Sequence, residues 1–165
     1  MSLYRNPTRD FTDQVSEVMA ASIAALRGYP SEGNYWLLHF PRESCELASW
    51  VVGSLLLELG FGDWTLVSGT IDSEQGSLTH RSGSHVWLEL RSDEEIAFSA
   101  DATADQFPEW ASQPFVVKGP SPLARFFSMN RRQNLISEPL EWHLDRFHAP
   151  PLAHVRDSVL HDKQR

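Results

Sequence analysis

The chain has 165 residues, of which 41% are hydrophobic and 22% charged, and its formal net charge is −8. This length and composition fit one globular domain with its own core and exclude a disordered or collagen-like chain. The acidic balance argues against general nucleic-acid binding, which needs a basic surface to neutralise phosphates. We therefore expect a single domain over residues 1–165 that binds no nucleic acid.

Cys45 is the single cysteine, which excludes a disulfide within the chain and a cysteine-rich zinc module. One free thiol fits a reducing compartment, and the N-terminal residues lack the apolar core of a signal peptide. The longest nearly apolar run, 47–57, is shorter than the roughly 20 residues of a membrane span. These features predict a cytoplasmic protein without membrane association and leave its oligomeric state open.

Two helices are predicted in the N-terminal part. The first has Thr8 or Asp10 as its cap, apolar residues at helical spacing over 11–26, and Gly28 at its end. The second begins around Ser44 and carries apolar residues so densely over 47–59 that we expect it to be buried on most sides.

Three strands are predicted after the second helix, over 64–71, 84–90 and 96–101. The segment 108–165 is punctuated by prolines, and it is predicted to be helical, with short helices over 123–135 and 152–160. This order of elements predicts an α+β fold in which a central helix packs on a small antiparallel sheet.

The register of the hairpin formed by the last two strands can be predicted from its apolar residues. A turn centred on Asp93 pairs Leu90 with Ile96, Leu88 with Phe98 and Val86 with Ala100, all on one face. The same register places His85 opposite Asp101 on the other face, unless a bulge shifts it. Opposed Cβ atoms are about 5 Å apart, so the imidazole and the carboxylate are expected to be within hydrogen-bonding reach.

Cys45 stands at the predicted start of the buried second helix. A helix N-terminus has partial positive charge and free N–H groups, which favour a thiolate and can bind an oxyanion. Together with a histidine on a strand and an aspartate that orients it, such a cysteine makes an activated nucleophile. Cys45, His85 and Asp101 are therefore the candidate catalytic triad.

The motifs around these residues resemble a known family. Cys45 at a helix start, His85-Val86-Trp87 on a strand and Asp101-Ala102-Thr103 at the end of the next strand are similar to the transglutaminase-like branch of the papain-like superfamily. The strings over 40–42 and 101–107 are similar to small bacterial proteins of that superfamily. The resemblance implies a papain-like or transglutaminase-like core over about 34–107.

The resemblance also implies amide chemistry. Cys45 would attack a carbonyl carbon, His85 would hold the thiolate as an ion pair and later protonate the leaving amine, and Asp101 would fix the imidazole tautomer. The substrate would be a peptide or protein amide, and the acceptor is either water or an amine. No cofactor is implied; calcium serves some animal relatives, but the chain has no EF-hand-like loop.

Four further residues are candidates for supporting roles. The side chain of His39 could complement the backbone N–H of Cys45 in an oxyanion hole, although a partly buried strand residue is the preferred interpretation. Trp87 could shield the ion pair, line a substrate cleft or belong to the core. Thr103 and Gln106 are interpreted as local contacts of the loop after the third strand.

Two other classes of function remain open. The fold could be a catalytically inactive binding module that uses its cleft for a partner. Alternatively, Cys45, His85 and Asp101 could join His39 or His80 in a mononuclear zinc site, although none of the short ligand spacings typical of zinc sites is present.

Overall fold

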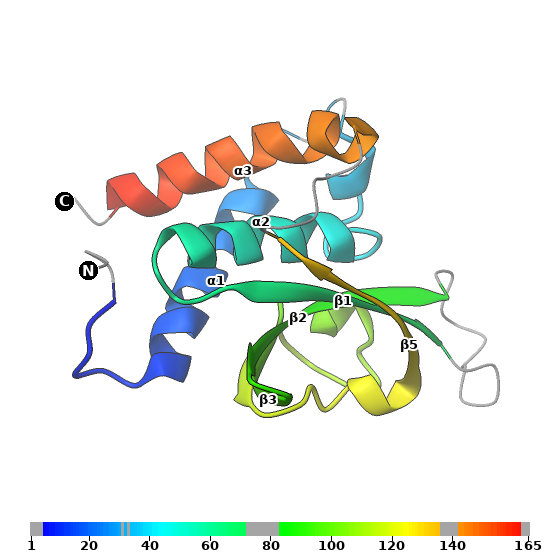
Figure 1. Cartoon of the computed structure of the whole chain (residues 1–165). Helices are drawn as coiled ribbons and strands as arrows, with labels where there is room; N and C mark the ends of the chain where they lie inside the picture. Colours follow the sequence, from blue (N-terminus) through cyan, green and yellow to red (C-terminus); the bar gives the residue numbers. More distant parts are fainter. Residues whose placement is uncertain (1–4, 31, 33, 72–82, 136–141, 163–165) are drawn as a thin grey trace.

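The computed structural model describes residues 5–30, 32, 34–71, 83–135 and 142–162 (Figure 1). Its helices are α1 (Phe11–Arg27), α2 (Cys45–Glu58) and α3 (Trp142–Asp162), with short 3₁₀ turns η1 (Tyr35–Leu37), η2 (Ala104–Gln106) and η3 (Ala124–Phe126). Its strands are β1 (Trp64–Ile71), β2 (Ser84–Ser92), β3 (Glu95–Asp101), β4 (Phe115–Lys118) and β5 (Phe127–Asn134). Within this described part the strands form one antiparallel sheet in the order β4-β3-β2-β1-β5, which confirms the α+β class.

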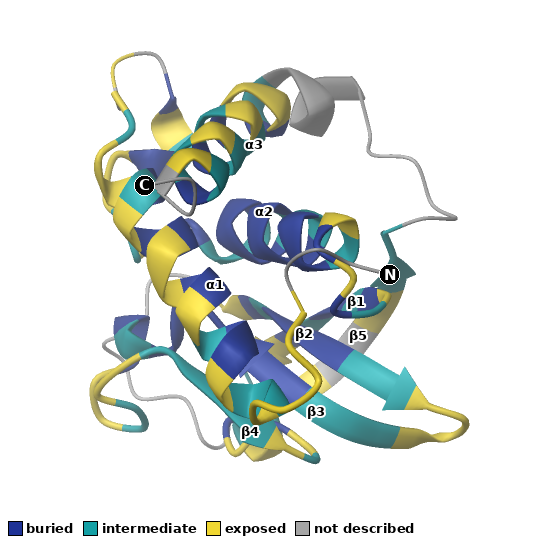
Figure 2. Ribbon diagram, turned by 90° about the vertical axis from the view of Figure 1, so that its left-hand side faces the viewer, coloured by how far each residue is buried: buried dark blue, intermediate teal, exposed yellow. Residues whose placement is uncertain are grey.

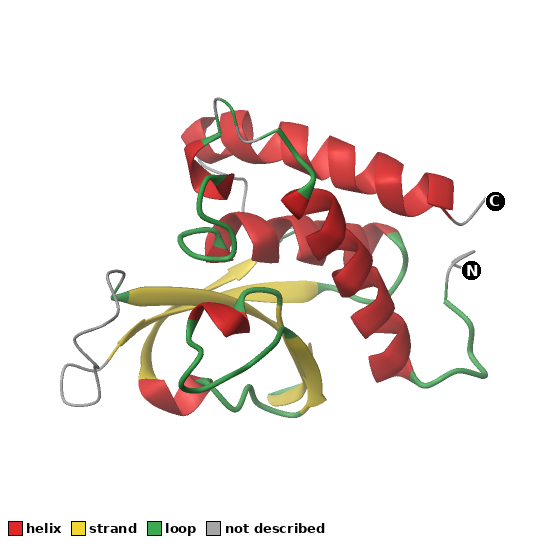
Figure 3. Cartoon of the chain, turned by 180° about the vertical axis from the view of Figure 1, so that it is seen from behind, coloured by secondary structure: helices red, strands yellow, loops and turns green. Residues whose placement is uncertain are grey.

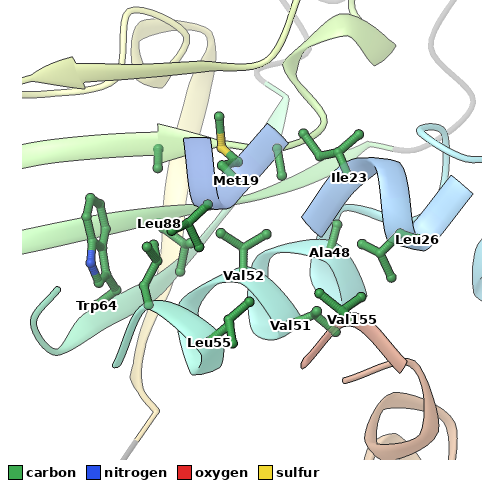
Figure 4. Close-up of a cluster of buried hydrophobic side chains, with 14 of the residues drawn as sticks. Met19, Ile23, Leu26, Ala48, Val51, Val52, Leu55, Trp64, Leu88 and Val155 are labelled. Atoms are coloured by element: carbon green, nitrogen blue, oxygen red, sulfur yellow. The ribbon is translucent and has the colours of Figure 1, made fainter. Parts of the chain in front are cut away.

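The sheet separates two hydrophobic clusters. Helices α2 and α3 lie on one side of it, whereas η2, η3 and their connecting loops lie on the other side (Figure 3). The larger cluster joins all three helices to the helix-facing side of the sheet. Figure 4 shows Met19, Val52 and Leu88 close together on the sheet side of α2, and Val155 beside Val51 on its other side. Each such fully buried aliphatic side chain contributes about 1.5–3 kcal/mol of transfer free energy.

Helix α1 begins where the sequence predicts. The carboxylate of Asp10 accepts hydrogen bonds from the backbone N–H groups of Thr12 and Asp13, which have no partner inside the helix. Gly28 follows the last helical residue, Arg27. The predicted helix is therefore confirmed, with Asp10 as its cap.

Helix α2 is the central helix of the domain, and the expected burial on most sides is confirmed (Figure 2). It packs against β1 and β2 on one side and against α1 and α3 on the others. Ser44, directly before it, donates its hydroxyl to the carbonyls of Trp36 and Arg42 and so ties the chain before the helix to its first turn. The position of Cys45 is consequently fixed by both packing and hydrogen bonds.

The predicted hairpin register is wrong by two residues. Leu88 pairs with Ala100 and Leu90 with Phe98, because two irregularities each add one residue to the pairing. The turn contains two residues between Ser92 and Glu95, and Ala97 is an extra residue at a bulge in β3. Beyond the bulge the even shift leaves Leu88, Leu90, Phe98 and Ala100 on their predicted face, so their apolar pattern alone does not distinguish the two registers. On the turn side of the bulge the shift is one residue, and Ile96 pairs with Arg91 rather than with Leu90.

The C-terminal segment differs most from its prediction. The helix predicted over 123–135 is instead η3 followed by β5, which pairs with the free edge of β1. Strand β4 was not predicted, and the helix predicted over 152–160 is the end of the longer α3, which includes Pro150 and Pro151. Pairing with a distant strand outweighs the local helical spacing of the β5 residues. None of the described helices is long and apolar enough to cross a membrane.

Candidate active site

Three elements bring the candidate triad together. Cys45 is the first residue of α2, His85 the second of β2 and Asp101 the last of β3. Nε2 of His85 lies 2.7 Å from Oδ2 of Asp101, and both side chains are completely buried. With Leu88 opposite Ala100, this contact is diagonal across the two strands, which imidazole and carboxylate can span.

The carboxylate of Asp101 has a partner on each oxygen. Oδ2 faces the imidazole, while Oδ1 accepts a hydrogen bond of 3.1 Å from the backbone N–H of Thr103. This second bond is the local turn contact expected after β3. The two bonds fix the carboxylate, and a carboxylate that faces Nε2 holds the proton on that nitrogen.

The charge state of His85 is set by its neighbours. Burial lowers the pKa of His85, but the charge and hydrogen bond of Asp101, followed by the hydrogen bond and charge of Cys45, outweigh this effect and raise the pKa to about 10. The ring is therefore an imidazolium at neutral pH. Because Nε2 faces Asp101, Nδ1 is the nitrogen that serves Cys45, whose side chain is partly exposed. An imidazolium next to a cysteine favours the thiolate.

Aromatic rings enclose the imidazole on the face of the sheet away from the helices. Trp87 stacks on His85 with ring centroids 5.9 Å apart, and the rings of Phe107 and Phe127 lie 4.9 Å and 5.4 Å away. These residues belong to the second hydrophobic cluster. Trp87 is only 2% exposed, so it acts as a shield and a core residue and has almost no surface that could line a substrate cleft.

Gly69 of β1 makes room for this aromatic enclosure. It pairs with His85, and a Cβ atom there would lie 2.7 Å from Cβ of Phe127 and 3.3 Å from the Trp87 ring. Gly69→Ala must therefore displace β5 or the tryptophan, and we expect a loss of about 1–3 kcal/mol in the free energy of unfolding by urea. Gly83→Ala, with open space around its Cβ, is the matched control and should change stability by less than about 0.5 kcal/mol. Equal stabilities of the two variants would contradict the steric argument.

The contact between Gln106 and the ring of His85 was not predicted from the sequence. Its Nε2 lies 3.0 Å from Nδ1 of His85 and 3.1 Å from Oγ1 of Thr103. The contact is therefore not only local, as predicted, but reaches across to β2. The signal in the sequence is its place five residues after Asp101, but only the fold of η2 turns the side chain back toward the ring.

His39 does not lie on a strand. It follows η1 in a turn, its side chain is exposed, and its carbonyl accepts a hydrogen bond of 2.8 Å from the N–H of Arg42. The preferred interpretation as a partly buried strand residue is therefore wrong, whereas the oxyanion role stays a prediction. In the described ranges no hydrogen bond joins its side chain to the triad. His80 lies outside the described residues.

A metal ion would need a group of at least three His, Cys, Asp or Glu side chains that point toward one another. No such group is present among the residues that the structure describes. A groove of about 590 Å³ lies between α1 and β4, but its lining does not include the triad. Arg27 at its edge forms an ion pair of 3.8 Å with Asp105, the neighbour of Gln106. The groove is thus linked to the site through the η2 turn and through β4, whose Phe115 lines the groove and pairs with Asp101.

Comparisons of the chain with protein-family models, curated proteins and solved structures find no match. The chemical interpretation of the site consequently rests on its geometry and charges and on the motifs of the sequence.

Proposed function

We propose that the protein is a thiol-dependent hydrolase or acyltransferase that acts on amide bonds. The observation that carries this proposal is the fully buried His85–Asp101 pair at 2.7 Å beside the partly exposed Cys45 at the start of α2. A nucleophile, a charged general acid and a fixed carboxylate are the three groups that acyl transfer requires.

The reaction would proceed in two halves. The thiolate of Cys45 attacks the carbonyl carbon, and backbone N–H groups at the start of α2 stabilise the oxyanion. The Nδ1 proton of His85 passes to the leaving amine, the C–N bond breaks, and a thioester remains. Water or an amine then attacks the thioester while Nδ1 takes its proton, and the acid or the new amide leaves with the thiolate restored. Asp101 stays ionised throughout and holds the proton on Nε2.

A papain-like core, a peptide or protein substrate and a cytoplasmic location are further parts of this proposal. A central helix with the nucleophile at its start and an antiparallel sheet that carries the other two groups support a papain-like, transglutaminase-like core. The substrate would be a peptide or protein amide. A single free thiol with this role supports the reducing cytoplasm as the place of action.

Alkylation of Cys45 by iodoacetamide at pH 6 tests the proposal. We expect rapid modification at Cys45 by mass spectrometry, because the charged His85 ring lies beside this side chain and activates it as a nucleophile. His85→Ala should slow this reaction about 100-fold, to the rate of an ordinary cysteine that ionises near pH 8.5.

His161→Ala, which removes an exposed histidine of α3, is the matched control and should leave the alkylation rate unchanged. Slow alkylation that His85→Ala does not alter would contradict the proposal and favour an inactive binding module.

A further inference from the structure

The Nδ1 atom of His85 lies 3.0 Å from the carboxamide nitrogen of Gln106, and the side chain of Cys45 forms a hydrogen bond with the same ring. Gln106 is almost fully buried, and its Nε2 lies within hydrogen-bonding distance of both Nδ1 and the hydroxyl oxygen of Thr103. Because Asp101 occupies Nε2 of the ring, these contacts bear on the one nitrogen that exchanges a proton in the proposed reaction.

The placed carboxamide suits only one charge state of the ring. Its nitrogen donates to Nδ1 when Nδ1 has a free lone pair, which is the neutral imidazole. In the imidazolium, Nδ1 carries a proton, and two donors would face each other. A half-turn of the carboxamide exchanges its nitrogen and oxygen at almost the same positions, so that Oε1 accepts from Nδ1.

Thr103 allows both orientations. Its hydroxyl accepts a hydrogen bond from the carboxamide nitrogen in one orientation and donates one to the carboxamide oxygen in the other. Gln106 therefore keeps its hydrogen bonds to Nδ1 and to Thr103 whichever way it faces, and neither charge state of the ring sets two donors against each other.

We propose that Gln106 is a positioning residue for His85 whose carboxamide turns over each time Nδ1 gains or loses its proton. The inference rests on the proposed function, since that reaction passes the proton through Nδ1. After the leaving amine takes this proton, Cys45 is acylated and cannot bind the ring. The donating carboxamide then holds the imidazole in place until water or an amine returns a proton.

The other surroundings of the ring support this role. The charged groups that act on His85 are Asp101 from β3 and Cys45 from α2, and the aromatic side chains around it carry no charge. Asp105 is not among the groups that shift the pKa of the ring; its own pKa is raised, mainly by burial and to a smaller extent by the charge of Asp101. Gln106 is thus the neutral partner that can follow the proton without favouring either state.

The first test observes the carboxamide directly in the full-length chain by NMR, with ¹³C at the side-chain carbonyl of glutamine and ¹⁵N in the histidine rings. The signal that Gln106→Met removes identifies Gln106. We expect this signal to shift with pH at the same midpoint as the Nδ1 signal of His85. A glutamine signal that stays constant while the ring titrates would overturn the inference.

The second test compares the His85 midpoint in Gln106→Met and Gln106→Glu. Methionine has a similar length but no hydrogen bond to offer, so a carboxamide that serves both states predicts a change below about 0.3 pH unit. A carboxamide fixed as donor would oppose the imidazolium, and its loss would raise the midpoint by about one unit or more, which overturns the inference. In Gln106→Glu the ionised carboxylate can only accept a hydrogen bond from Nδ1, which favours the protonated ring. This variant should therefore raise the titration midpoint of His85.

Gln113→Met, at an exposed position, is the matched control and should leave the His85 midpoint unchanged. If Gln106→Met does not fold, Gln106→Glu identifies the signal, and the common midpoint of the first test decides. These measurements need no substrate. If the Gln106 signal shifts with His85 but Cys45 does not react with iodoacetamide, this inference stands and the proposed function is removed. If Cys45 reacts as expected but the Gln106 signal stays constant, the proposed function stands and this inference is removed.

Discussion

Asp101→Ala is expected to destabilise the protein by about 3–5 kcal/mol in urea unfolding, because it leaves the buried His85 without its counter-charge. It also removes the acceptor of the Thr103 N–H bond. The pKa of His85 should fall sharply in this variant, since the charge and hydrogen bond of Asp101 are the main contributions that raise it. A titration of the ring by NMR measures this fall in the folded variant.

Two further variants isolate the cause. Asp101→Asn keeps an oxygen acceptor but removes the charge, and it should destabilise less than alanine. Asp157→Ala, on the exposed surface of α3, should change stability by less than about 0.5 kcal/mol. A similar loss for Asp101→Ala and Asp157→Ala would show that the buried pair contributes nothing to the fold.

Stability is expected to decline from neutral to alkaline pH because of His85. The pKa of His85 is about 10 in the folded chain and near its ordinary value of 6.5 in the unfolded chain. Below pH 6.5 both states carry the proton, and the contribution of the buried ion pair to stability is complete. Between these values only the folded state keeps the proton, so the contribution of His85 to the free energy of unfolding falls by about 1.4 kcal/mol per pH unit. Above pH 10 the contribution is lost.

Urea unfolding of the Cys45→Ala protein at several pH values from 6 to 9.5 measures this slope, because that protein has no thiol whose ionisation is coupled to His85. Adding His85→Gln to the same protein removes the titrating ring and should give a flatter dependence over the same range. Parallel curves for the two proteins would mean that the folded ring does not hold its proton above pH 6.5. The two proteins share every other titrating group, so the difference between their slopes reports His85 alone.

The hairpin shows what apolar alternation can and cannot predict. It placed Leu88, Leu90, Phe98 and Ala100 on one face, and the structure has them there. The bulge at Ala97 and the two-residue turn changed the pairing by an even number, to which a period of two is insensitive. His85 still meets Asp101 because long side chains reach a diagonal neighbour.

The sequence by itself determined the elements whose signals are local. The Asp10 cap, the dense apolar spacing of α2 and the alternation of β1 to β3 each arise within one segment, so they predict helix and strand wherever the segment lies in the fold. The same local signals put Cys45 at a helix start and gave the candidate site its three residues.

Only the tertiary structure decided the features that depend on distant partners. The residues of β5 become a strand because β1 offers a free edge, and Trp87 is buried because the η2–η3 loops and β5 cover its face of the sheet. Gln106 reaches Nδ1 of His85 because η2 folds back beneath β2. Such contacts depend on the free energy of packing between segments far apart in the chain, which no periodicity within one segment records.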